Sequence, residues 1–303
     1  MKKYALILLT TLMIIAVGCA NDTTKKDNVG SPFVGGDKGI IAEFLRSGVY
    51  SEADKIEEIF DKETFPLEIV FKNKGEANIV AGEAVIKLSG VELSQFEPVM
   101  PDRKANTFDL EAVSDSNTQG GEETISIGTF AYKGPLVGNS IDLSFFGKIE
   151  YSYKTSISVP QVCLKGDLND ASLCKVDETK QVFSSAAPIQ AKTAVEKSAG
   201  TGKVSVEIEV QNVGSGKVTL PNTDFDYRFD QLAFEVTPDD KWDCKAGGNA
   251  VSARLDSTGK ATIVCRLKNA LQKSDLFTQA LGITLKYQYR DIIHKQLRVK
   301  RQG

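Results

Sequence analysis

Histidine is almost absent from this chain of 303 residues, in which His294 is the single one. That scarcity excludes a metal site built from several histidines and any mechanism that needs two of them. An excess of either charge is also missing, because 40 acidic side chains stand against 37 basic ones and the formal net charge is −3. This balance argues against a polyanion-binding surface spread over the chain, so we expect no nucleic-acid partner. The length fits about two domains.

Long helical periodicity is nearly absent as well. One segment, Ser51–Phe60, is a candidate helix because Ser51 and Asp54 could form a capping box, although a polar loop that leads into a strand fits the same residues. Elsewhere, short alternating runs of Val, Ile, Phe and Tyr are separated by Gly, Asn, Asp or Pro, which is typical of antiparallel strands. The sequence therefore predicts an all-β fold. The predicted strands are Phe65–Lys72, Ala84–Leu88, Thr124–Phe130, Ile141–Phe145, Ile149–Val159, Val204–Val210, Leu232–Val236, Ala261–Leu267, Ile283–Tyr289 and His294–Val299.

The start of the chain has the features of an export signal. Lys2 and Lys3 precede an apolar run, Tyr4–Ala16, that is shorter than the roughly 20 residues of a membrane span. Residues Ala16–Cys19 then resemble the lipobox of prokaryotic lipoproteins, in which the cysteine is lipidated and becomes the new N-terminus. Ala16 stands where that motif usually has Leu.

The lipobox resemblance implies a signal peptide over residues 1–18 and a lipid on Cys19. An uncleaved N-terminal anchor is the alternative, and both place the body of the chain at the extracytoplasmic face of the cell membrane. Residues 19–36 are poor in apolar side chains and contain several Gly, Ser and Thr, so they form a predicted flexible tether.

Two features of the sequence occur twice. Phe65–Gly75 and Val204–Gly214 are both alternating strands that end in Asn-x-Gly, and Ile149–Lys154 matches Leu285–Arg290, each with two tyrosines at alternate positions. Because both matches have nearly the same offset, we predict two copies of one domain. Strands of this pattern with turns at this spacing point to tandem antiparallel β-sandwiches. The looser segment Ser184–Pro188 marks the boundary, which gives predicted domains over residues 37–185 and 186–303.

Apart from Cys19 the chain has four cysteines, Cys163, Cys174, Cys244 and Cys265. An even number in an exported chain predicts two disulfides, although four cysteines allow three pairings. We favour Cys163–Cys174 and Cys244–Cys265, because each pair falls within one predicted domain. Their spacings are too wide for the close cysteine pairs of a zinc site.

A strand followed by an Asn-x-Gly turn, as at Asn73–Gly75 and Asn212–Gly214, resembles the immunoglobulin-like domains of the CARDB type, which occur in bacterial and archaeal surface proteins. Together with the lipobox, the tandem repeat and one cysteine pair per repeat, this is similar to surface lipoproteins of prokaryotes, archaea in particular. The resemblance implies two tandem immunoglobulin-like sandwiches and no catalytic residues.

The function implied by this resemblance is that of a membrane-anchored extracellular protein, a non-enzymatic structural, adhesive or binding module without a cofactor. Its partners would be the membrane, through the lipid, and other envelope proteins or surface polymers. Two alternatives stay open: an accessory subunit of an envelope assembly such as a pilus, secretion or transport complex, and a secreted glycan-binding protein or hydrolase. The sequence does not indicate an oligomeric state.

Motifs for cofactors and metals are incomplete. The glycines before Lys217 resemble a phosphate-binding loop, but Gln211 and Val218 stand where that motif needs Gly and Ser or Thr. The segment Asp115–Gly120 begins like a calcium loop, yet Ser126 takes the place of the required Glu. We therefore expect no metal site, and no spacing of acids selects a catalytic pair.

A basic run near residue 300 is the candidate surface-binding feature. It contains Lys295, Arg298, Lys300 and Arg301 without an acid among them. On an edge strand such charges discourage pairing with another sheet, and they could also bind acidic envelope polymers or lipid headgroups. His294, at the start of the run, is expected to be an exposed strand residue.

Aromatic side chains suggest packing more than chemistry. Trp242, beside Cys244, is expected to pack on a disulfide as in immunoglobulin domains. The paired tyrosines of the repeat share a sheet face, where cross-strand packing is the expected use and stacking on a sugar is the alternative.

Overall fold

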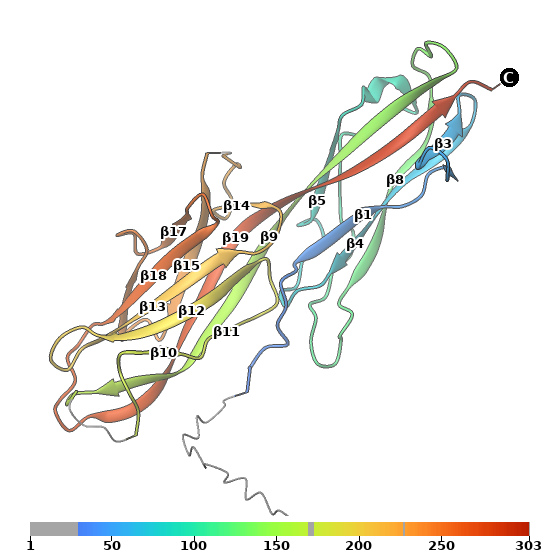
Figure 1. Cartoon of the computed structure of the whole chain (residues 1–303). Coiled ribbons are helices and arrows are strands. Elements are labelled where there is room, and N and C mark those ends of the chain that lie inside the picture. Colours follow the sequence, from blue (N-terminus) through green and yellow to red (C-terminus); the bar gives the residue numbers. More distant parts are fainter. Residues whose placement is uncertain (1–29, 169–172, 227, 303) are drawn as a thin grey trace, which may run out of the picture. The chain divides into compact units, whose positions relative to one another are not determined.

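The computed structural model describes residues 30–168, 173–226 and 228–302, and Figure 1 shows their arrangement. Regular structure in these residues is β, apart from one short 3₁₀ turn at Leu93–Gln95. The residues from Ser31 onward form one compact unit. The expectation of an all-β fold is confirmed.

The strands form three sheets, and the largest, which we call the shared sheet, runs alongside both of the others. The first sheet has four strands in the order β1 (Ile40–Phe44), β4 (Thr64–Asn73), β8 (Glu122–Tyr132) and β6 (Phe96–Glu97). The second sheet has five strands in the order β10 (Glu178–Lys180), β12 (Ile189–Ser198), β13 (Val204–Asn212), β18 (Lys260–Leu267) and β16 (Trp242–Lys245).

The shared sheet has ten strands and two long members at its centre. Its main path is β17 (Ser252–Leu255), β15 (Asp230–Thr237), β19 (Leu276–Lys300), β9 (Ser140–Lys165), β5 (Val85–Ser89) and β7 (Arg103–Ala105). Off this path lie β2 (Val49–Ser51), β3 (Ile56–Phe60), β11 (Phe183–Ser184) and β14 (Lys217–Thr219). The first and second sheets each pack on part of the shared sheet, an arrangement consistent with β-sandwiches.

β9 and β19 pair antiparallel along almost their whole length, from Leu276 opposite Lys165 to Lys300 opposite Ser140. Each therefore joins two strands that the sequence predicts as separate. In β9 the apparent break is at Gly147, which is buried between the predicted strands. A Cβ at this position would stand 2.6 Å from Cδ1 of Ile86, so a side chain at this inward position would displace Ile86 from its packing.

The long strands divide the unit into two halves that we name by their sheets. The first half contains the first sheet, β2, β3, β5, β7 and the paired residues 140–150 of β9 and 290–300 of β19; the second half contains the other strands. Residues 290–300 thus pair in the first half, although the sequence assigns them to the second predicted domain. The division into domains 37–185 and 186–303 stays a prediction.

The Asn-x-Gly turn of the first half is held by a tyrosine from β9. Asn73 donates from Nδ2 to the carbonyl of Ala77 at 2.7 Å, and its Oδ1 accepts from the amide of Gly75 at 3.2 Å. The hydroxyl of Tyr153 donates to the same Oδ1 at 3.1 Å and accepts from the amide of Ala77 at 3.3 Å. This network ties the turn to the facing strand.

The turn of the second half repeats these bonds with a tyrosine from β19. Asn212 donates from Nδ2 to the carbonyl of Gly216 at 2.8 Å and accepts from the amide of Gly214 at 3.1 Å. The hydroxyl of Tyr289 donates to Asn212 Oδ1 at 3.3 Å and accepts from the amide of Gly216 at 2.8 Å. The repeated residues of the sequence therefore occupy equivalent places.

The candidate helix at Ser51–Phe60 is wrong, and its alternative is confirmed: β2 and β3 form an antiparallel hairpin there. The Asp54 amide does bond the Ser51 hydroxyl at 3.3 Å, as in a helix start. Lys55, however, has a φ of 54° in the left-handed region, so the chain reverses instead of continuing a helical turn.

Both expected disulfides are formed, Cys163–Cys174 and Cys244–Cys265. Cys244 and Cys265 are opposite residues of β16 and β18 in the second sheet. Cys163 pairs with Thr278 of β19, and its amide donates to the side-chain carboxylate of Glu196 on β12. Both disulfides therefore lie in the second half as the sheets define it, because β9 carries Cys163 out of the first half. The expectation of one pair per predicted domain stays a prediction, as the domain division does.

The cores of the two halves differ in composition. In the first half Phe96 lies at the centre of an aromatic group, with its ring centroid 5.6–6.5 Å from those of Phe65, Phe130, Tyr132 and Phe145. In the second half the buried residues of the facing strands are mainly aliphatic: Val204, Val206, Ile208, Val210, Ile263, Leu281, Ile283 and Leu285.

Candidate binding groove

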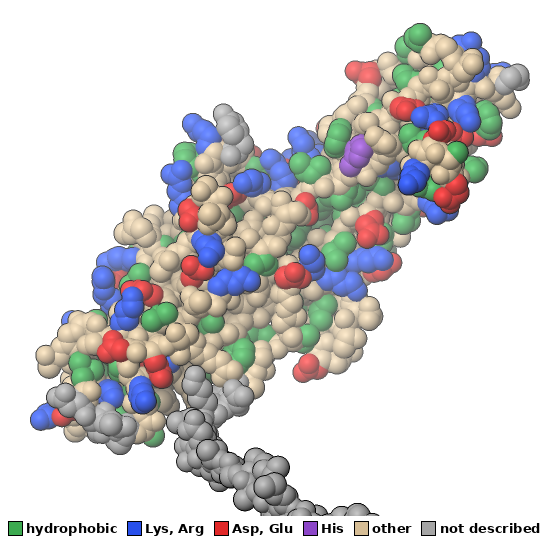
Figure 2. All heavy atoms as spheres, in the orientation of Figure 1, with side chains coloured by type: hydrophobic (Ala, Val, Ile, Leu, Met, Phe, Trp, Pro, Cys, Tyr) green, Lys and Arg blue, Asp and Glu red, His purple; other side chains and the backbone are tan. Residues whose placement is uncertain are grey.

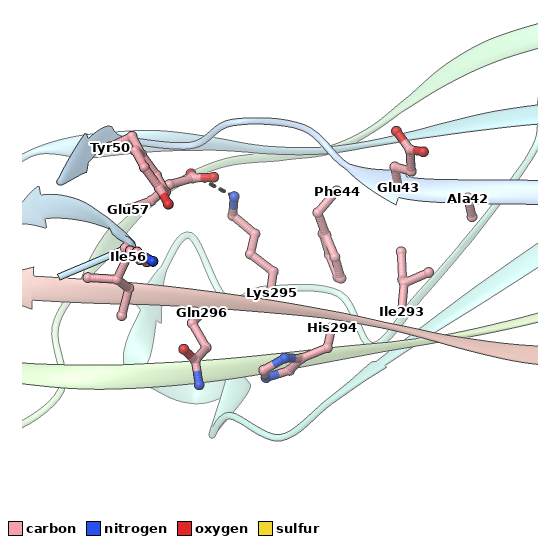
Figure 3. A pocket seen from close by; sticks show the side chains of 11 residues that line it. Ala42, Glu43, Phe44, Tyr50, Ile56, Glu57, Ile293, His294, Lys295 and Gln296 are labelled. Atoms are coloured by element: carbon pink, nitrogen blue, oxygen red, sulfur yellow. Dashed lines mark hydrogen bonds and ion pairs between the residues drawn. The ribbon is translucent and has the colours of Figure 1, made fainter. Parts of the chain in front are cut away.

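A groove of about 740 Å³ opens between β1, the β2–β3 hairpin and β19 (Figure 3). Ala42 and Phe44 line it from β1, Ile56 from β3 and Ile293 from β19. The size is within the range of ligand pockets, and the apolar lining is partly exposed. A second, smaller cavity of about 200 Å³ shares Ala42 and Ile293 and continues along β1 toward Gly214.

Two strand edges border this groove. β1 is the outer strand of the first sheet and pairs only with β4 among the described strands. On β19, the pairing with β14 ends at Arg290 and the pairing with β3 begins at Leu297. Residues 291–296 of β19 consequently have β9 as their only strand partner within the described part of the chain. The shared sheet has an interrupted edge at the groove.

A buried ion pair closes one end of the groove. Nζ of Lys295 lies 2.6 Å from Oε2 of Glu57, and it also donates to the carbonyl of Leu45 at 2.9 Å (Figure 3). The same carboxylate oxygen accepts from the amide of Ser47 at 2.7 Å. Because Lys295 is only 6% exposed, this pair fixes the spacing of β1, β3 and β19 rather than presenting a free charge.

Two other charges line the groove and remain available. Glu43 on β1 and Lys55 in the hairpin turn are both exposed. Neither forms an ion pair with any residue that the structure describes. A ligand in the groove would therefore meet one acid and one base.

His294 also borders the groove, but Figure 3 shows its side chain on the opposite side of β19 from Ile293, and it is exposed, as the sequence predicts. It is the purple side chain in Figure 2, and its ring stacks on that of Phe146 with centroids 4.7 Å apart. Phe146 is 39% exposed and Ile292, nearby on β19, is 55% exposed. These residues form a small apolar area without other chemistry.

The basic run does not form one free positive patch. Besides Lys295, Arg298 binds Asp142 at 2.7 Å and Asp54 at 2.8 Å, and Lys300 binds Glu58 at 2.9 Å. The pKa of Asp142 is lowered by the hydrogen bond from Arg298. Only Arg301, which donates to the carbonyl of Leu136 at 3.0 Å, has no acidic partner among the described residues.

The expected role of these charges on an edge strand is also corrected, because Arg298 and Lys300 lie where β19 has β9 on one side and β3 on the other. Over the face shown in Figure 2, acidic and basic side chains are mixed. The binding role of the four basic residues stays a prediction.

The tyrosines of the repeat pack against one another where β9 and β19 cross between the halves. Tyr153 is opposite Tyr287 and Tyr151 is opposite Tyr289, and all four are at most 5% exposed. Burial raises the pKa of Tyr289 to about 12, and it raises the pKa of the other three as well. Their burial fits the expected cross-strand packing and leaves no open face for a sugar.

Glu196 is a fully buried acid beside the Cys163–Cys174 disulfide. Its Oε2 accepts from the Cys163 amide at 3.0 Å and lies 3.0 Å from Nζ of Lys180, whereas its Oε1 has no hydrogen-bond partner among the described residues. Burial raises the pKa of this carboxyl despite the nearby lysine. Trp242 is 3% exposed in the same core as Cys244, and its packing on the disulfide stays a prediction.

No group of three or more potential metal-binding side chains occurs among the residues that the structure describes. Asp226 pairs with Arg228, which lowers the pKa of Asp226 to about 2, and Asp230 pairs with Lys217. Cys19 and the lipobox lie outside the described residues. In the described part, no helix is both long and apolar enough to cross a membrane.

Comparison with protein-family models gives no match for this chain, and no curated protein matches it either.

The groove is the feature that sequence reasoning missed. The predicted strands Ile283–Tyr289 and His294–Val299 leave Arg290–Ile293 unassigned, because two polar residues interrupt the alternation. This interval overlaps the stretch where β19 has β9 as its only strand neighbour among the described residues. The interrupted alternation was therefore the one local sign of the open edge. No sequence pattern near these residues indicates that β19 meets β1 and the β2–β3 hairpin.

Proposed function

We propose that this protein is a membrane-anchored, extracytoplasmic module of two immunoglobulin-like halves that acts by binding other molecules and not as an enzyme. The observation that carries the proposal is the pair of formed disulfides, since such bonds persist in oxidising compartments. They agree with the resemblance of Ala16–Cys19 to a lipobox, which supplies the anchor.

The immunoglobulin-like character is supported by the equivalent turns of the two halves. Asn73 with Tyr153 and Asn212 with Tyr289 make the same set of bonds, as expected for two copies of one ancestral unit of the CARDB type. A binding role is supported by the groove and the interrupted edge of β19, because exposed sheet edges are a common place for protein recognition.

The anchor is tested by replacing Cys19→Ser in the full chain and following the protein between membrane and soluble fractions of the producing cells. We expect the variant to leave the membrane, while the neighbouring control Ala20→Ser stays. Retention of Cys19→Ser would favour an uncleaved N-terminal anchor. Free thiols at Cys163, Cys174, Cys244 or Cys265 in the exported protein would contradict the extracytoplasmic location.

An accessory subunit of an envelope assembly is the second candidate, and the interrupted edge favours it because a permanent partner could complete the sheet. Cross-linking on intact cells, then capture of a C-terminally tagged chain and mass spectrometry, distinguishes the two. Envelope proteins recovered at fixed ratio indicate an assembly subunit. Recovery with scattered neighbours indicates an independent adhesive or binding module.

A further inference from the structure

We infer that the open edge of β19 at residues 291–296 binds an extended segment of a partner protein, which adds one strand to the shared sheet. This inference deepens the proposed binding function and rests on it. Its occupant is a peptide backbone in strand conformation, not a sugar or a metal ion.

The first argument is the position of the interruption. β14 and β3 pair with the same edge of β19 on either side of residues 291–296, with β14 ending at Arg290 and β3 beginning at Leu297. The ladder is therefore present before and after the gap. Six residues at about 3.3 Å each span roughly 20 Å, which is the length of an ordinary strand.

The second argument is the direction of the backbone groups at the gap. The amide of Ile292 donates to the Asp291 side chain at 2.8 Å, so it does not bond to β9. The carbonyl of Lys300, further along the strand, accepts from Asp61 on the side of β3. Because alternate residues of a strand direct their backbone groups to the same side, His294 and Gln296 share this orientation. The backbone groups of His294 and Gln296 therefore face the gap, where an added strand can pair with them, whereas the Ile292 amide already bonds the side chain of Asp291.

The third argument is the lining of the groove. Ala42 and Phe44 of β1 and Ile293 of β19 offer apolar surface to the alternate side chains of an added strand. Glu43 lies beside the Ile293 end of the groove in Figure 3, and Lys55 precedes Ile56 at the opposite end. A matching segment therefore carries a basic residue at one end and an acidic residue at the other.

A second copy of this chain is a poorer occupant. The gap is recessed, because β14 and β3 occupy the same edge at both of its ends. In a dimer, β14 and β3 of each copy would collide before the two gaps could pair. A segment with both of its own edges free can enter.

The test uses the full chain and a displayed library of random octapeptides between glycine spacers. We expect enriched peptides with alternating apolar residues that bind the unmodified protein and the control His294→Thr equally. Binding to His294→Pro should fall by about tenfold, the loss expected for one or two main-chain hydrogen bonds, since proline removes the outward amide without affecting β9. Gln296→Pro provides a second variant in case the first fails to fold.

Two further readouts locate the peptide. Amide hydrogen exchange on the unmodified chain should show new protection at His294 and Gln296 when an enriched peptide binds. The double variant Glu43→Lys with Lys55→Glu should reverse the preferred charges of the peptide ends.

Absence of enriched peptides, or binding that survives both proline variants, would overturn the inference. Self-association that either proline variant abolishes would overturn it in favour of a second copy. None of these outcomes depends on the Cys19→Ser fractionation, so failure of the groove and failure of the anchored location are distinguishable.

Discussion

The two halves use the same turn but stabilise their cores differently. Both tie an asparagine to a tyrosine of a long strand. The first half then packs aromatic rings around Phe96 and contains no cysteine in its described residues, whereas the second half has a mainly aliphatic core and both disulfides. The turn is thus the constant element, and the source of core stability is the variable one.

Phe96→Ala should cause the largest loss of stability, and this loss should be confined to the first half. Phe96 is 2% exposed and touches four aromatic rings, so we expect a loss of about 3–5 kcal/mol in the free energy of unfolding. Denaturant unfolding measures the loss, and hydrogen exchange should place the earliest opening in β4 and β8. Earliest opening in β13 and β18 would contradict separate sources of stability.

Removal of the Cys244–Cys265 bond should give a somewhat smaller loss, located in the second half. The bond closes a sequence separation of 21 residues, for which about 3 kcal/mol is expected. The double variant Cys244→Ser with Cys265→Ser should therefore speed exchange in β16 and β18. The matched control is amide exchange at β4 in the same double variant, which we expect to be unchanged. Equal acceleration at β4 would show that the two halves open together.

The shared turn should itself distinguish the halves. Asn73 is fully buried and also donates to the carbonyl of Leu110 at 3.0 Å, a bond that has no equivalent at the half-buried Asn212 among the described residues. Asn73→Ala is expected to cost about 2–3 kcal/mol and Asn212→Ala about 1 kcal/mol. Thermal unfolding of the two variants checks this order, and an equal or reversed order would refute it.

The smallest effect is the alkaline response of the tyrosines. A raised pKa means that folding favours the neutral phenol, so this stabilisation is complete below pH 10, the ordinary tyrosine pKa, and is lost as the pH rises through the folded pKa of Tyr289, about 12. Unfolding measured between pH 9 and pH 12 should show the decline, and Tyr289→Phe should lessen it. Tyrosinate absorbance from these residues at pH 10 without unfolding would count against it.

Local patterns were sufficient to predict the strands but not their connections. Phe65–Lys72 and Val204–Val210 lie within β4 and β13 because alternation over a few residues determines a half-buried strand. The fusion of two predicted strands into β9 was missed because Gly147 has no side chain to continue the pattern. The favoured cysteine pairing is confirmed, yet the place of Cys163 depends on β9 crossing between halves, which no local feature reveals.

The groove depends on still more distant information. Leu45 and Lys295 are bonded across a sequence separation of 250 residues, and β3 meets β19 over a similar span. Neither the basic run nor the hairpin turn contains a signal for that meeting. Lys295, Arg298 and Lys300 were expected to carry free charges, but each forms an ion pair with an acid. These acids are too distant in the sequence for the basic run to predict the pairs.

The crossing of β19 between the halves has a consequence for the order of folding. β1 and β4 are made early during synthesis, but the first half cannot close until residues 290–300 are available to pair with β9 and β3. Contacts of such separation slow folding, because the loop must be closed before the contact contributes. The half whose strands begin first is therefore completed last, and a chain cut at residue 185 would lack the strand that finishes it.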